Sequence, residues 1–390
     1  MKSIRVLEII SGFAVEGPLG GIERFGIELA RSFDRAQIEP ILCGMWAYGT
    51  PYEYEWVSRL QTEGIHSFIV DDWQESSPYR SFVQVNKKLA SLVNKVDIIH
   101  SHCQFGDVLA LLNYRRLQAK AIVRTVHNEK EWGKRPLRRL LLTNILYPFT
   151  FDLEMGVAQQ VIEKLNQRPI AQWLKKESIK SYNALNFHRF TGLNIDVVAK
   201  KMSLGLETSA RVIGTVGRLS PQKGYSYLLD AAAQIVTDFP DAVFVIVGNG
   251  ELRTQLEDQA ERLGLQNHVK FLGARSDVEE LLSIMDVFVN SSQWEGLPTV
   301  IMESMAAKVP VVATDVGGNS ELIQDKVTGW LVPPQEAGQL AAQISHVLTM
   351  DQAELELFRQ RAYERVHQLF SIETVARQHE HLYKQLIANT

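Results

Sequence analysis

Two cations, Arg218 and Lys223, follow a strand-like run and could act on a departing diphosphate. They lie in the segment GRLSPQKG, directly after the apolar run VIGTV. A guanidinium binds phosphate oxygens through two hydrogen bonds, whereas an ammonium acts as a compact point charge. Two solvated surface cations are the alternative interpretation. The position at the end of a strand favours the phosphate interpretation.

Two carboxylates, Glu295 and Glu303, lie in the later segment EGLPTVIME. Their spacing alone proves nothing, because other glutamate pairs in the chain share it. Pro298 is placed to start a helix. We therefore expect Glu295 in the loop after a strand and Glu303 on the following helix, so that both can reach one ligand.

Glycines follow two of the strand-like runs. Gly20 and Gly21 stand directly before a predicted helix, where backbone amides can hold a phosphate; a tight turn is the alternative. Their spacing is not that of a dinucleotide-binding loop. A second motif, GNG at 248–250, has Arg253 where the third glycine would stand, which disfavours a hydride-transferring dehydrogenase.

Helical patterns separate apolar runs throughout the chain, which predicts parallel sheets covered by helices on both faces. At 390 residues and 45% hydrophobic composition, two cores are expected. The fold class is therefore α/β, with two doubly wound domains. The predicted strands are Ile4–Ile10, Ile38–Cys43, Ser67–Val70, Ile98–His100, Ala121–Thr125, Val212–Val216, Ala242–Val247, Val269–Leu272, Val287–Asn290 and Val309–Thr314.

The polar passage at 176–182 interrupts the pattern and is the predicted linker. It divides the chain into a first domain of residues 1–178 plus 372–390 and a second of residues 179–371. Ligands of doubly wound sheets bind at the carboxyl ends of the strands. A cleft between two such domains is therefore the expected site.

Composition excludes several classes of protein. A charged fraction of 22% and a net charge of −4 argue against disorder and against nucleic-acid binding. Two cysteines, Cys43 and Cys103, are too few for a disulfide framework or a thiolate metal site, so a cytoplasmic location is the default expectation. The N-terminus predicts a strand and not a signal peptide. No Asp-x-Asp triplet occurs, so neither a metal nor another cofactor is expected.

The motifs taken together resemble the retaining GT-B glycosyltransferases of family four, also known as the glycosyl transferases group 1. The resemblance rests on GGIER, GRLSPQKG, FLG, EGLPTVIMESMAAKVPVVATDVGGNSELI, GWLVPP and the terminal helix FSIETVARQHEHLYKQLI. It spans essentially the whole chain and is strongest in residues 212–333. It implies two Rossmann-like domains facing across a cleft, with the C-terminal helix crossing back to the first domain.

The resemblance also implies roles for matching positions. Arg218 and Lys223 would hold the diphosphate of a nucleotide-sugar donor, helped by amides at Gly21. The remaining assignments are the amides of Thr299 and Val300 for the diphosphate, Glu303 for the ribose, and Glu295 and His127 for the transferred sugar.

The implied reaction moves a sugar, without metal, from a nucleotide-diphosphate sugar to a hydroxyl of a glycan, glycolipid or small molecule. A sugar-nucleotide epimerase and a non-catalytic binding subunit of the same fold stay open as alternatives. The chain departs from the family at Asn183-Ala184-Leu185-Asn186, where relatives have Gly at the second position. Ala184 cannot adopt a positive φ as readily, so the local backbone is expected to differ.

Basic and apolar residues are interspersed in the segment KRPLRRLLLTNIL at 134–146. Such a segment can rest on an anionic membrane surface, which would place the protein at the inner face of the membrane. The alternative is a helix whose apolar side faces the core and whose arginines face solvent. The nearby apolar run at 140–151 is too short to span a bilayer, which takes roughly 20 residues.

Overall fold

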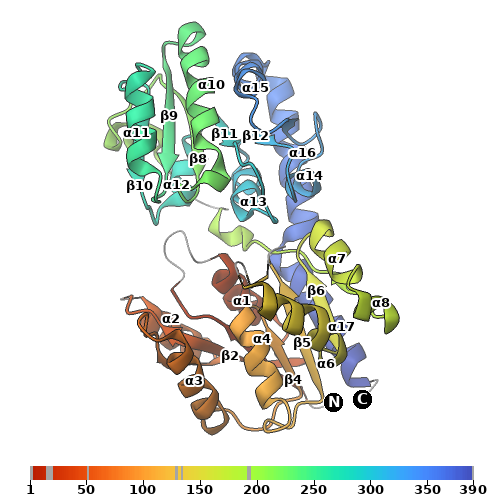
Figure 1. Ribbon diagram of the computed structural model, residues 1–390. Helices are drawn as coiled ribbons and strands as arrows, with labels where there is room; N and C mark the ends of the chain where they lie inside the picture. The colour runs from red at the N-terminus through yellow and green to blue at the C-terminus, as the bar shows by residue number, and fades with distance from the viewer. Residues whose placement is uncertain are drawn as a thin grey trace. The chain divides into compact units, whose positions relative to one another are not determined.

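The chain forms two compact units (Figure 1). The computed structural model describes residues 3–14, 21–50, 52–127, 131–132, 135–190 and 195–388. The first unit comprises Met1–Ala184 with Ile372–Thr390, and the second comprises Leu185–Ser371.

The first unit contains a seven-stranded parallel sheet of order β3-β2-β1-β4-β5-β6-β7. Its strands are β1 (Ile4–Ile10), β2 (Ile38–Ala47), β3 (His66–Asp72), β4 (Ile98–Ser101), β5 (Ala121–Val126), β6 (Leu153–Gly156) and β7 (Ile179–Lys180). Its helices are α1 (Gly21–Ser32), α2 (Glu53–Thr62), α3 (Pro78–Leu92), α4 (Gln104–Asn113), α5 (Pro136–Arg138), the π-helix η1 (Arg139–Leu146), α6 (Tyr147–Thr150), α7 (Gln159–Asn166), α8 (Pro169–Trp173) and α17 (Ile372–Ala388).

Apolar side chains cover both faces of this sheet, as uninterrupted hydrophobic strands require. On one face Phe25 and Leu29 of α1 pack with Val375 and Tyr383 of α17. The other face packs against apolar side chains of α3 and α4. The C-terminal helix therefore belongs to the core of the first unit, as expected.

The second unit contains a six-stranded parallel sheet of order β10-β9-β8-β11-β12-β13. Its strands are β8 (Arg211–Val216), β9 (Ala242–Val247), β10 (Val269–Gly273), β11 (Val287–Asn290), β12 (Val311–Thr314) and β13 (Trp330–Val332). Its helices are η2 (Phe187–Arg189), α9 (Val197–Ser203), η3 (Pro221–Lys223), α10 (Tyr225–Asp238), α11 (Arg253–Arg262), α12 (Val278–Ser283), α13 (Thr299–Ala306), α14 (Asn319–Leu322), α15 (Ala337–Thr349) and α16 (Gln352–Phe370).

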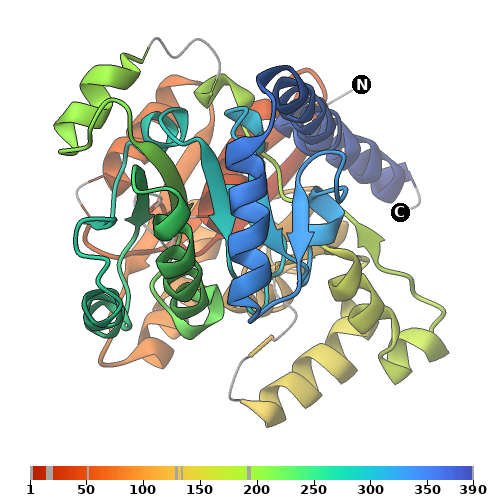
Figure 2. The same ribbon diagram turned by 90° about the horizontal axis from the view of Figure 1, so that it is seen from above.

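Strand order reverses once in each sheet. In the second sheet the chain moves outward from β8 through β9 to β10, and then returns to place β11 on the other side of β8. Figure 2 views the same elements from above. In doubly wound sheets the loops at such a reversal diverge and leave room for a ligand at the carboxyl ends of the two strands.

The boundary between the units differs from the sequence-based prediction. The structure divides the chain after Ala184 and not after residue 178. The reason is β7, which lies within the predicted linker at 176–182 and pairs with β6 through Met155↔Ile179. Only two residues of this polar passage pair at the sheet edge. The passage therefore carries no hydrophobic period, and its sequence predicted a linker.

Candidate active site

Lys223 and Glu295 meet at the strand reversal of the second sheet. Lys223 ends η3, in the turn after β8, and Glu295 lies in the loop after the neighbouring strand β11. The Lys223 Nζ atom lies 2.5 Å from Glu295 Oε1, and the two side chains are 18% and 6% exposed. The two sequence-predicted residues are thus brought together at the edge where a doubly wound sheet binds its ligand.

Neighbouring side chains fix the orientation of the Glu295 carboxylate. Ser292 Oγ donates to Glu295 Oε1 at 2.6 Å, and Gln222 Nε2 donates to Oε2 at 3.3 Å. Asn290 Nδ2, at the end of β11, lies 3.4 Å from the same Oε1 atom. Both carboxylate oxygens are engaged, so the carboxylate is preorganised and does not need to reorient when a ligand arrives.

Glycines allow the loops around this pair to pass in direct backbone contact. Gly224, directly after Lys223, has φ +61°, and a Cβ there would lie 2.1 Å from the carbonyl oxygen of Ser291. Gly317 has φ +52°, and a Cβ there would lie 2.0 Å from the carbonyl oxygen of Glu295. Any side chain at these positions would displace the loops that carry the candidate residues.

Arg218 lies on the same edge of the sheet but has a different partner. Its guanidinium is 3.2 Å from the Glu251 carboxylate, and its side chain is 57% exposed. The two cations predicted to act as a pair therefore occupy separate environments. Of the two, Lys223 is the cation that contacts Glu295.

Thr299 and Val300 form the first turn of α13, which begins directly after Pro298. Glu303 lies one turn further along and is mostly buried, with 12% of its side chain exposed. Arg189, from η2, places its Nη1 atom 3.9 Å from Glu303 and also bonds to Glu279. Glu303 therefore has a cation close by, which the sequence did not predict.

Gly21 and His127 are the predicted residues of the first unit. Gly21 begins α1, and a Cβ added there would meet no atom within 4 Å. Its partner in the prediction, Gly20, lies outside the described residues. His127 follows β5 and is buried, with 8% of its surface exposed.

The His127 ring is held by Asn183. The Nδ1 and Oδ1 atoms of the two residues lie 2.9 Å apart, and a carbonyl oxygen can only accept, so Nδ1 donates. The Nε2 atom of His127 is buried and has no hydrogen-bond partner among the described residues. Burial, followed by nearby His102, lowers the pKa of His127 to about 3, so the ring is neutral near pH 7.

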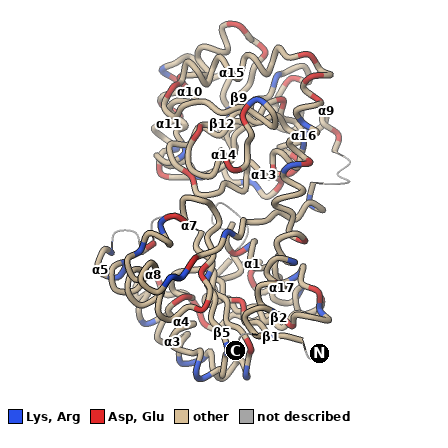
Figure 3. Tube along the Cα trace, turned by 90° about the vertical axis from the view of Figure 1, so that its right-hand side faces the viewer, with Lys and Arg blue, Asp and Glu red and all other residues tan. Residues whose placement is uncertain are grey.

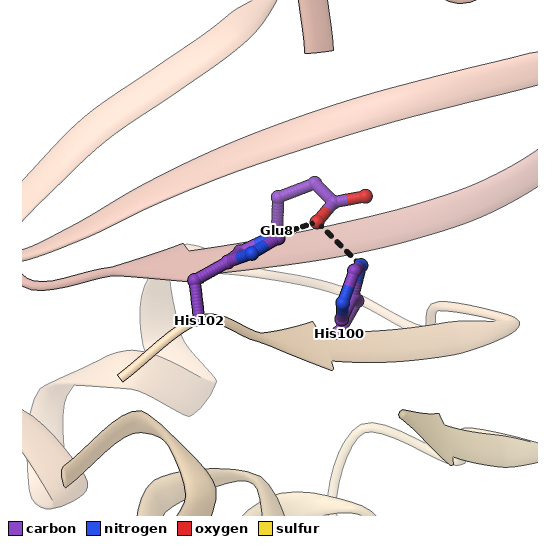
Figure 4. Close-up of side chains that lie close together, drawn as sticks. All are labelled: Glu8, His100 and His102. Atoms are coloured by element: carbon purple, nitrogen blue, oxygen red, sulfur yellow. Dashed lines mark hydrogen bonds and ion pairs between the residues drawn. The ribbon is translucent and has the colours of Figure 1, made fainter. Parts of the chain in front are cut away.

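A buried carboxylate lies beside two further histidines within the first sheet (Figure 4). The Oε2 atom of Glu8 is 2.8 Å from His102 Nε2 and 3.0 Å from His100 Nδ1. Tyr383 of α17 donates its hydroxyl to Glu8 Oε1 at 2.9 Å. Burial raises the pKa of Glu8, but His100 and His102 outweigh it, so the pKa lies below its ordinary value.

The ligand atoms of Glu8, His100 and His102 all lie within 4.8 Å of one another, a spacing that could hold a metal ion. Both Glu8 oxygens, however, already accept hydrogen bonds. His100 Nε2 is also bonded, at 2.8 Å from the Thr125 hydroxyl. The atoms that would bind a metal are therefore already engaged in hydrogen bonds, and only His102 Nδ1 of the group has no partner among the described residues.

Sequence reasoning missed several residues that support the predicted ones. Gln222 lies within the motif that carries Lys223, and Ser292 lies shortly before Glu295. Their hydrogen-bond donor groups were the signal that could have identified them. For the buried network the signals were Glu8 inside an apolar run and the HSH motif at 100–102. Ala184 is not among the described residues with positive φ.

Comparison with known proteins places both units in one family. The sequence model described as glycosyl transferases group 1 matches residues 198–365, and the model described as glycosyltransferase family 4 matches residues 19–154.

Individual relatives agree with the family models. The chain is 28% identical over 272 residues to an Escherichia coli UDP-Gal:alpha-D-GlcNAc-diphosphoundecaprenol alpha-1,3-galactosyltransferase, covering 65% of this chain and 67% of that protein. An uncharacterized glycosyltransferase of Methanocaldococcus jannaschii is 34% identical to this chain over 208 residues. The matched region covers 52% of this chain and 53% of that protein.

Solved structures show the same fold. The structure of Anabaena HepE in complex with UDP and glucose superposes with a TM-score of 0.80 at 23% identity, covering 98% of this chain and all of that one.

Proposed function

Because the chain belongs to the family-four glycosyltransferases, with models matching 19–154 and 198–365, we propose that it transfers a sugar from a nucleotide-diphosphate sugar to a hydroxyl acceptor with retention of configuration. The observation that carries this proposal is the contact between Lys223 and Glu295 at the strand reversal of the second sheet. The UDP and glucose bound in HepE support a uridine diphosphate sugar as the donor to test first.

The proposed roles follow from charge and position. Lys223 stabilises the diphosphate as it leaves, with Arg218 binding the outer phosphate oxygens and the first amides of α13 adding donors. Glu295 exchanges its contact with Lys223 for one beside the transferred sugar. Glu303 accepts hydrogen bonds from the ribose hydroxyls, and His127 uses its free Nε2 to accept one from a sugar hydroxyl.

In the proposed reaction the bond between the anomeric carbon and the phosphate oxygen breaks, and a bond to the acceptor oxygen forms on the same face. The acceptor's proton passes to the departing phosphate oxygen. The charge of the leaving group is neutralised by side chains and backbone amides, and we propose that no metal takes part. The donor sugar is the only co-substrate in this scheme.

We further propose a membrane-borne acceptor, met by peripheral contact at the inner face of the membrane. The name of the Escherichia coli relative specifies a diphosphoundecaprenol-linked acceptor. Within the part of the chain that the structure describes, no helix combines the length and apolar character that a bilayer crossing needs. Peripheral contact would bring such an acceptor to the enzyme.

Incubation with uridine, guanosine and adenosine diphosphate sugars and a panel of lipid-linked and free glycan acceptors tests the proposal, with EDTA present in a parallel series. We expect a new glycosidic bond of the donor's anomeric configuration, identified by the coupling constant of the anomeric proton. Acceptor-free conversion of one nucleotide sugar into another would identify an epimerase instead. Absence of both donor binding and donor hydrolysis across the panel would identify a binding subunit.

A further inference from the structure

The helical run formed by α5, η1 and α6 presents large apolar side chains to solvent. Leu137 is 73% exposed, Leu141 is 58% exposed, and Trp173 of neighbouring α8 is 74% exposed. We define the leucine face as these residues together with others of the same run: Leu137, Leu140, Leu141, Ile145, Leu146, Phe149 and Trp173. The rings of Phe149 and Trp173 lie 6.2 Å apart, which joins α8 to the run.

The position of these side chains reverses the usual arrangement of a surface helix. A surface helix normally turns its apolar stripe towards the core. Here Leu137, Leu140, Leu141, Ile145 and Phe149 follow one another at intervals of three, one, four and four residues and lie on the outer side. The alternative that the sequence left open holds in part: the arginines face solvent and Leu142 and Tyr147 pack in the core, but most leucines of the run are exposed.

Both apolar and polar contacts on the inner side hold the run in this orientation, and Leu142 and Tyr147 pack against the core of the first unit. Arg168 is buried and donates from Nη1 to the carbonyl oxygen of Thr143 at 2.9 Å. The buried Arg124 guanidinium lies 4.4 Å from the centre of the Tyr147 ring, and Arg124 itself faces Glu131 and Glu154. The leucine face is thus the outer side of an anchored element and not the exposed side of a frayed one.

Positive charge accompanies the leucine face. Arg135, Arg138 and Arg139 are exposed, and residues 135–150 include no aspartate or glutamate. Within the described ranges none of these three arginines has an acidic partner, and Arg138 lies 5.8 Å from the Trp132 ring. Lys175 adds a further exposed cation beside Trp173. Figure 3 marks the basic positions in blue.

We propose that the leucine face docks on the surface of an anionic lipid bilayer. The apolar side chains enter the boundary between headgroups and acyl chains, while the arginines bind lipid phosphates. Cations without an acidic partner among the described residues, next to exposed leucines, match the two layers of such a surface, one anionic and one apolar. The proposal goes beyond the transfer reaction and requires neither donor nor acceptor.

Sedimentation with vesicles tests the docking, using vesicles of phosphatidylcholine alone and vesicles of phosphatidylcholine mixed with the anionic lipid phosphatidylglycerol. We expect binding to the anionic vesicles at low salt and at least a tenfold weaker partition for Leu137→Ser/Leu140→Ser/Leu141→Ser. Arg135→Ala/Arg138→Ala/Arg139→Ala should bind as weakly as wild type does in high salt.

The matched control is Leu92→Ser/Leu112→Ser/Leu357→Ser, which removes three exposed leucines elsewhere and should bind like wild type. Thermal unfolding of each variant reports whether it is folded. Brominated lipids should quench wild-type fluorescence more than that of Trp173→Phe.

Failure of the folded wild type to bind anionic vesicles would overturn the proposal, as would wild-type binding by the leucine variant. Dimerisation lost only in the leucine variant would assign the face to a second copy. All these outcomes are independent of transferase activity.

Discussion

The two units place their ionisable side chains in different parts of their sheets. In the second unit Lys223 and Glu295 lie in loops at the carboxyl edge, and none of the described strands there carries a buried charged residue. In the first unit Glu8 of β1, His100 of β4 and Arg124 of β5 are buried within the sheet itself.

This difference separates charges that serve a ligand from charges that serve the fold. The rim pair of the second unit can exchange partners when a donor arrives. The buried groups of the first unit already have partners within the protein, so removing one leaves another unsatisfied. Perturbing the buried network around Glu8 in the first unit should therefore change stability, whereas perturbing the rim of the second should change activity.

Lowering the pH should have the largest effect, because it should destabilise the first unit more than the second. Burial is the main cause that lowers the pKa of His102 and His379 to about 4 and of His127 to about 3, and all three belong to the first unit. Between pH 6.5 and 4 the unfolded chain then binds more protons than the native one, so stability falls as the pH falls through this window. Each unit of pKa difference corresponds to about 1.4 kcal/mol.

Hydrogen exchange measured by mass spectrometry at several pH values distinguishes the units. After correction for intrinsic exchange rates, β1 and β4 should lose protection between pH 6.5 and 4, while β8 and β11 lose less. Equal losses in both sheets, or unchanged protection of β1 at pH 4.5, would contradict the assignment.

Replacing Lys223 by alanine should have the next largest effect, and this effect should be on activity and not on stability. Loss of a group that stabilises developing charge lowers turnover about 100-fold, equivalent to about 2.7 kcal/mol. The measurement is the transfer rate at saturating donor. Arg262→Ala removes an exposed cation from α11 and serves as the control. A fully active Lys223→Ala enzyme would remove this residue from the proposed mechanism, and its thermal unfolding midpoint should match that of the wild type.

Tyr383→Phe should destabilise the first unit by about 2 kcal/mol, because the buried Glu8 carboxylate loses a hydrogen-bond donor. Urea unfolding measures the change. Tyr363→Phe in α16 of the second unit is the matched substitution and should leave stability within about 0.5 kcal/mol of wild type. Equal effects of the two substitutions would show that the Tyr383 hydroxyl contributes little.

Asn183→Ala should have the smallest effect, about a tenfold loss of turnover, because His127 keeps its position but loses the acceptor that fixes its tautomer. Asn183→Asp places a carboxylate at the same point and should raise the pKa of His127, which adds an acidic limb to the pH profile. A flat profile for Asn183→Asp, together with full activity of Asn183→Ala, would show that Asn183 does not position the ring.

Local sequence patterns predicted much of the fold. The predicted strands Ile4–Ile10, Ala242–Val247 and Val287–Asn290 are confirmed with identical bounds. The strands β6, β7 and β13 were missed: β7 and β13 have only two and three residues, and β6 carries Glu154 and Gly156 among its four, so none shows an apolar run long enough to stand out. The assignment to a family and the fold class are confirmed.

The candidate site was predicted as far as local motifs reach. Lys223 and Glu295 were placed together because each follows a strand of the same predicted sheet. Arg218 could not be placed, because the direction of a long exposed side chain depends on a neighbour, Glu251, that no spacing reveals. The partners Tyr383 of Glu8 and Asn183 of His127 come from distant parts of the chain, and their contacts exist only after folding. The catalytic roles stay predictions.

The bond between Tyr383 and Glu8 joins positions 375 residues apart in the chain. During synthesis the ribosome must therefore translate the whole of the second unit before the helix that closes the first one emerges. Until then Glu8 Oε1 lacks its tyrosine donor, and the face of the first sheet that α1 and α17 cover together is covered by α1 alone. We expect the second unit to mature first, and pulse-labelled hydrogen exchange of nascent chains stalled before α17 emerges should find β8 better protected than β1.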